Sequence, residues 1–110
     1  MKEEVLEYTQ KYNDDIQKLF IDLRNLVYQS ISCEIEEKLW AKIPSYYVGE
    51  KFIRIIPFKD HINIEAKATV DYKQQLEQYK LTPKGMLQIY LNQCIPDNVL
   101  VAIFHKTLTE

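Results

Sequence analysis

Apolar residues recur every three or four positions between Ile16 and Val27, which is the spacing that lines one face of an α-helix. Asn13 or Asp14 can cap the start of this helix. The preceding segment, residues 3–11, permits a helix but offers few apolar positions. It therefore predicts a short separate helix or a weakly docked one.

A second helix is predicted over Cys33–Lys42, because apolar residues follow one another there at four-residue steps. These residues are Ile35, Leu39 and Ile43. Ser32 can cap this helix, and Pro44 supplies its stop.

After Pro44 the period changes from about four to two, which is typical of strands. Residues 46–48 and 51–56 predict a hairpin with a tight turn at Gly49-Glu50. A further turn leads into a strand over His61–Ala66, in which apolar and polar side chains alternate strictly. Ile62, Ile64 and Ala66 are expected on the core face, and His61, Asn63 and Glu65 on the other.

The remaining chain predicts a helix over Asp71–Tyr79, a strand over Met86–Leu91 and a last helix that begins at Asp97. Its buried side is expected to carry Val99, Leu100, Ile103 and Phe104. Helices followed by a run of strands indicate one α+β domain over residues 1–110. In it, helices cover one face of an antiparallel sheet.

The amino-acid composition makes some classes of function improbable for this chain. With 14 Lys and Arg against 16 Asp and Glu, the chain lacks the basic excess that nucleic-acid binding needs. The acidic N-terminus and the lack of a long apolar stretch predict a cytoplasmic protein with no membrane partner. The two cysteines, Cys33 and Cys94, have no metal or redox spacing and are expected to be free thiols.

Acidic residues suggest one candidate site. Glu34, Glu36 and Glu37 lie together, and with His61 they could hold a labile iron ion at the surface. The alternative is a solvated charged face, in which Glu34 pairs with Lys38 one helical turn away.

Tyrosines suggest another. The chain has 8 Tyr and 12% aromatic residues, and side chains of this kind form either a core edge or the wall of a ligand pocket. Trp40, Tyr47 and Tyr90 are the candidate ligand-binding residues. No nucleophile elbow, phosphate loop or metalloprotease motif occurs, so a non-enzymatic protein is expected.

Several segments resemble the DUF1801, or YdhG-like, family. They are Glu37–Tyr46, Lys51-Phe52, Phe58–Ile62 and Lys84–Ile89, followed by Ile95-Pro96. The resemblance implies an α+β fold with a curved antiparallel sheet, and some members of that family are described as frataxin-like iron chaperones. The matching positions are Glu37, Pro44, His61 and Gly85. Gln88 departs from the Arg or Lys that is usual in the late strand, which weakens any idea that the site binds an anion and leaves the iron role neither stronger nor excluded.

Two hypotheses follow from these observations. The first is a protein that binds labile iron and delivers it to acceptor proteins. The second is a domain that binds a small molecule or a protein partner in an aromatic-lined groove. A monomer or a weak dimer through sheet edges is expected in either case.

Overall fold

Six antiparallel strands form an open sheet in the computed structural model, which describes residues 1–110. The helices are α1 (Glu3–Thr9), α2 (Asp14–Ser30), the 3-10 helix η1 (Lys67–Leu76) and α3 (Asp97–Thr109). The strands are β1 (Glu36–Trp40), β2 (Ile43–Val48), β3 (Lys51–Pro57), β4 (His61–Ala66), β5 (Lys80–Leu81) and β6 (Leu87–Tyr90). Their order in the sheet is β1-β2-β3-β4-β6-β5. The predicted α+β fold is confirmed.

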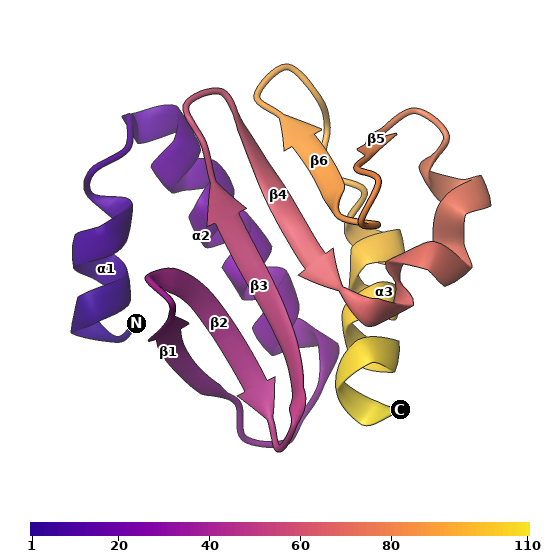
Figure 1. Ribbon diagram of the computed structural model, residues 1–110, viewed down its shortest axis with the longest axis horizontal. Helices are drawn as coiled ribbons and strands as arrows, with labels where there is room; N and C mark the ends of the chain where they lie inside the picture. The colour runs from indigo at the N-terminus through magenta and orange to yellow at the C-terminus, as the bar shows by residue number, and fades with distance from the viewer.

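The helices lie against one face of the sheet, and the opposite face is left open. In Figure 1, α2 and α3 lie behind the strands, and the open face is turned to the viewer. The strand alternation explains this division, because Ile53, Ile55, Ile62 and Ile64 are fully buried on the helix side. No helix is both long and apolar enough to cross a lipid bilayer.

Where local signals were strong, the predicted elements are confirmed. The side chain of Asn13 caps α2 by accepting a 2.9 Å hydrogen bond from the N–H of Ile16. The hairpin of β2 and β3 turns at Gly49, whose φ of 63° suits glycine. In α3, Leu100, Ile103 and Phe104 are buried, while Val99 is only partly so.

The predicted helix over Cys33–Lys42 is wrong, because this segment contains strand β1 and a hairpin turn. Ala41 and Lys42 have φ values of 49° and 66°, and two left-handed residues in succession form the turn that joins β1 to β2. Pro44 stops no helix. It lies in β2 opposite Leu39.

The predicted helix over Asp71–Tyr79 is displaced. The chain instead forms η1 earlier, over Lys67–Leu76, and Tyr72 interrupts it with a non-helical φ of −118°. The short strand β5 follows, and it pairs with β6 in a segment between the predicted helix and the predicted strand, where no strand was expected.

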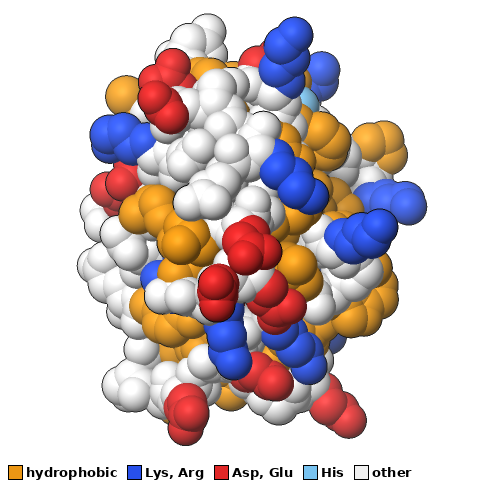
Figure 2. All heavy atoms as spheres, turned by 90° about the vertical axis from the view of Figure 1, so that its left-hand side faces the viewer, with side chains coloured by type: hydrophobic (Ala, Val, Ile, Leu, Met, Phe, Trp, Pro, Cys, Tyr) orange, Lys and Arg blue, Asp and Glu red, His pale blue; other side chains and the backbone are white.

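Charges of both signs are mixed on the side of the molecule that carries α1 and β1 (Figure 2). Figure 2 faces the side of the molecule that carries α1 and β1, and there acidic and basic side chains alternate with exposed hydrophobic ones. Neither sign forms a continuous patch in this view. Recognition on this side therefore cannot rest on a strong field of one sign.

Candidate binding site on the open sheet face

Arg54 lies at the centre of the open face, surrounded by aromatic rings. Its guanidinium carbon is 4.0 Å from the ring centre of Trp40 on one side and 3.8 Å from that of Phe52 on another. Its Nη2 donates a 3.2 Å hydrogen bond to the hydroxyl of Tyr47. We call Trp40, Tyr47, Phe52 and Arg54 the open-face cluster.

Strand geometry explains how this cluster forms. Tyr47 of β2 lies opposite Phe52 of β3, and Arg54 is two residues further along on the same face. Trp40 comes from β1, beyond β2. An arginine between aromatic rings is held by cation–π attraction as well as by its hydrogen bonds.

Arg54 is almost completely buried by its neighbours, yet it retains an unused donor. Only 7% of the residue is exposed, and its Nε has no hydrogen-bond partner. Its charge is balanced by Glu65 of β4, whose Oε1 is 3.4 Å from Nη1. Trp40, in contrast, is 52% exposed. The open-face cluster thus combines a fixed, neutralised arginine with a ring that remains free for contact.

A second aromatic group lies on the same face, where β4 begins. The ring of His61 stacks between those of Phe58 and Tyr90, with ring centres 4.7 and 4.6 Å apart. Its Nδ1 is 2.8 Å from Asp60 Oδ1, and this hydrogen bond holds the pKa of Asp60 below its ordinary value. We call Phe58, His61 and Tyr90 the histidine stack.

A groove of about 870 Å³ adjoins the open-face cluster at the end of the sheet where β2 turns into β3. Four separate segments form it, and we call it the end groove. They are residues 48–52, residues 65–70, residues 84–86 and the end of α3 at Thr107 and Leu108. Phe52 and Glu65 belong to the groove and also contact Arg54. The two features are therefore continuous.

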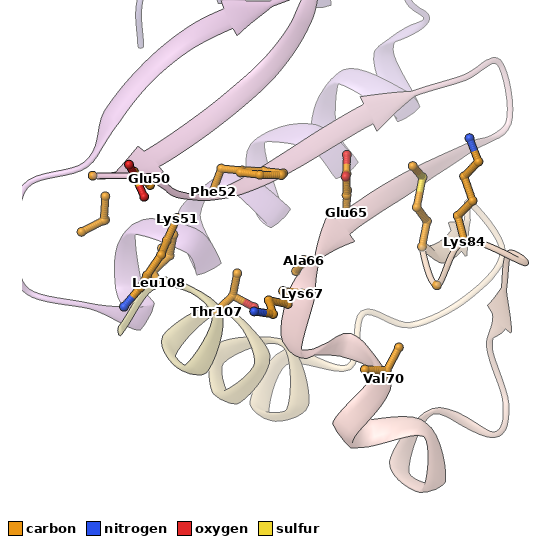
Figure 3. Close-up of a pocket in the computed structure, with 14 residues that line it drawn as sticks. Glu50, Lys51, Phe52, Glu65, Ala66, Lys67, Val70, Lys84, Thr107 and Leu108 are labelled. Carbon is orange, nitrogen blue, oxygen red and sulfur yellow. The ribbon is translucent and has the colours of Figure 1, made fainter. Parts of the chain in front are cut away.

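Side chains of the end groove are shown in Figure 3. Glu65 and Lys84 point to the same side of it, and Lys67 lies between Phe52 and α3 in this view. The volume falls within the range of about 300–1,000 Å³ that is typical of small-molecule sites.

The four predicted metal ligands are not brought together. Glu34 is exposed before β1, while Glu36 and Glu37 point to opposite faces of that strand. His61 belongs to β4, which β2 and β3 separate from β1. No group of three or more His, Cys, Asp and Glu side chains is arranged to hold a metal ion.

Glu37 is instead part of a buried ion pair on the helix side of the sheet. Its carboxylate accepts hydrogen bonds of 2.6 and 3.1 Å from Arg24 of α2, and one of 2.8 Å from the backbone N–H of Lys2. Burial alone would raise the pKa of Glu37. The hydrogen bonds lower it by more than burial raises it, so the pKa lies below its ordinary value. Burial also raises the pKa of Tyr46, the residue opposite Glu37, so its phenol stays neutral.

The predicted ligand-binding residues all lie on the open face. Trp40 and Tyr47 belong to the open-face cluster, whereas Tyr90 belongs to the histidine stack. Sequence reasoning missed Phe52 and Arg54 as site residues, although their positions two apart in a predicted strand place them on one face. It also missed the lysines of the end groove, which no local motif connects.

The comparisons with known proteins give no relative: no family model matches the sequence, and no curated protein or solved structure is significantly similar.

Proposed function

We propose that this chain is a non-enzymatic binding domain, which takes a small molecule with a flat aromatic part at the open-face cluster and the adjoining end groove. The observation that carries the proposal is the half-exposed ring of Trp40 beside an arginine that other rings hold in place. Because these contacts already hold Arg54 in place, binding should cost little ordering of its side chain.

The concave shape of the end groove favours a small molecule as the ligand. The end groove begins at Phe52, so a flat compound can contact the edge of the cluster and still be enclosed by η1 and α3. Pockets of this kind combine apolar walls with a few polar groups that fix orientation. Here Phe52, Val70 and Met86 supply apolar surface, and Glu65 and Thr107 supply polar groups.

The arrangement of carboxylates favours this proposal over iron delivery. Two of the candidate iron ligands already have partners, because Glu37 is bound by Arg24 and Glu36 lies 3.6 Å from Lys38. The remaining candidates are Glu34, which precedes β1, and His61 of β4. An iron site built from both would need ligands from distant parts of the sheet.

Nuclear magnetic resonance tests the proposal directly, because Trp40 is the only tryptophan and gives a single indole N–H signal. We expect benzamide, benzoate or phenyl phosphate to shift this signal and the backbone signal of Phe52 in a saturable way. A Phe52→Leu variant should weaken binding about tenfold, since a stacking contact contributes about 1 kcal/mol or more.

The matched control is Phe58→Leu, the same substitution in the histidine stack at the other end of β3. It should leave binding unchanged. The proposal is wrong if none of the three compounds moves the signals of Trp40 and Phe52, or if both variants weaken binding equally.

A further inference from the structure

Three lysines line the end groove, and none of them is engaged in an ion pair. Lys51 follows the β2–β3 turn, Lys67 follows β4, and Lys84 precedes β6. The ion pairs of the molecule involve other cations, among them Lys18, Lys38 and Lys106. The three ammonium groups around the groove therefore lack partners, although the chain as a whole carries a net charge of −2.

The acids of the groove do not cancel these charges. Glu65 is paired with Arg54 outside the groove, so its carboxylate is already balanced. Glu50 is exposed at the β2–β3 turn, and it leaves an excess of positive charge among the groove residues. Several positive charges around a concave site with apolar walls produce a strong positive potential inside it. This potential attracts an anion.

Apolar surface lies next to these cations. Val70 of η1 is 49% exposed and lines the groove. Gly85 has a φ of 86°, and a Cβ at this position would lie 3.4 Å from Val70 Cγ1. The positive φ is what favours glycine at this position, and the loop before β6 lies beside Val70 of η1.

We infer that the end groove binds a small organic anion, with its carboxylate or phosphate monoester attracted by the lysines that line the groove (Figure 3) and a flat apolar part lying against Phe52. Lys51 adds to the positive field from the β2–β3 turn. This inference rests on the proposed function, and it adds the charge of the ligand to it. Charge-assisted hydrogen bonds are the stronger ones, so the anionic group should decide affinity.

The experiment compares benzoate with benzamide, which have nearly the same shape but differ in charge, and adds phenyl phosphate as a second anion. Titrations use the full chain and follow the backbone signals of Lys67, Gly85 and Met86. Both anions should bind about tenfold more tightly than benzamide, as expected for loss of a charge-assisted contact.

The variant Lys67→Gln/Lys84→Gln should reduce the affinity for both anions about tenfold and leave that for benzamide unchanged. The matched control is Lys42→Gln/Lys59→Gln, which removes the same charge at the opposite end of the sheet, where β1 turns into β2 and β3 leads into β4. It should change none of the affinities by more than about twofold. Spectra without ligand show that each variant is folded.

The outcomes separate the two proposals. Equal binding of benzoate and benzamide, or equal effects of the two double variants, would overturn the anion inference and leave the binding domain standing. If none of the compounds moves the groove signals or that of Trp40, both proposals are wrong. Shifts by both anions that depend on Lys67 and Lys84 support the inference.

Discussion

Glu37 is a carboxylate in a position where the strand pattern calls for an apolar residue. It points to the helix side of β1, only 5% exposed, and its charge is balanced by Arg24 of α2. The N–H of Lys2 completes its hydrogen bonding and connects α1 to the sheet. A single side chain therefore joins the first two helices to the edge strand.

Replacing Glu37 by Gln should destabilise the fold by about 3 kcal/mol, because it leaves the guanidinium of Arg24 without its counter-charge in a largely buried setting. Urea denaturation measures this change. The control is Glu36→Gln at the neighbouring position, where the side chain is exposed and the change should stay below about 0.5 kcal/mol. Equal losses from both variants would contradict the account.

The same pair makes stability depend on pH in a definite direction. The pKa of Glu37 is lowered in the folded state, so its contribution is complete above the ordinary value of 4.5 and disappears as the pH falls through the folded pKa. The difference in unfolding free energy between the natural chain and Glu37→Gln should shrink between pH 7 and the acid range. A difference that stays constant to low pH would show that the carboxylate charge is unimportant.

Among the elements, those specified by local pattern were predictable and those specified by distant contacts were not. The apolar stripe of α2 and the alternation of β4 identify their structures without reference to other segments. In β1 the alternation is broken by Glu37, whose partner Arg24 lies in another element. The remaining four-residue spacing of Ile35 and Leu39 then imitates a helix.

The candidate site was predictable to a similar extent. The sequence predicts Trp40 and Tyr47 as ligand-binding residues because they are aromatic, and in the structure both contact Arg54. The lysines of the end groove come from three segments that meet only in the folded chain, so no sequence spacing connects them. A site built from converging loops leaves no periodic signal.

The β1–β2 turn provides a test at the scale of the element. Lys42 has a left-handed φ of 66°, which costs free energy for a residue with a side chain, so Lys42→Gly should stabilise the protein by about 0.5–1 kcal/mol. In the helix that the spacing first suggested, the same change would destabilise by about 1 kcal/mol. Thermal or urea unfolding measures the sign, and a loss of stability would contradict the hairpin.

At the scale of the whole molecule, helices occupy one face of the sheet and leave the other for recognition. The histidine stack and the open-face cluster lie on this open face, and the end groove adjoins the cluster. The face that carries α1 and β1 has charges of both signs, whereas the lysines of the groove have no partner in an ion pair (Figures 2 and 3). Recognition is thus expected where apolar walls and uncompensated cations coincide.

Ferrous ion should find no specific site on this molecule. The strands of Glu37 and His61 are three strand spacings apart in the sheet, or about 14 Å, whereas metal–ligand bonds are about 2 Å long. An anaerobic titration followed by nuclear magnetic resonance should show weak, non-saturable effects at exposed carboxylates. Saturable binding of one equivalent at Glu37 and His61 would contradict this expectation.

The most direct test of the central claim is a crystal structure of the full chain with bound benzoate. We predict that the ring lies against Phe52 within the end groove and that the carboxylate is within hydrogen-bond distance of Lys67 or Lys84. Benzoate bound only at the histidine stack or on the helix side of the sheet, or no benzoate at saturating concentration, would contradict the account.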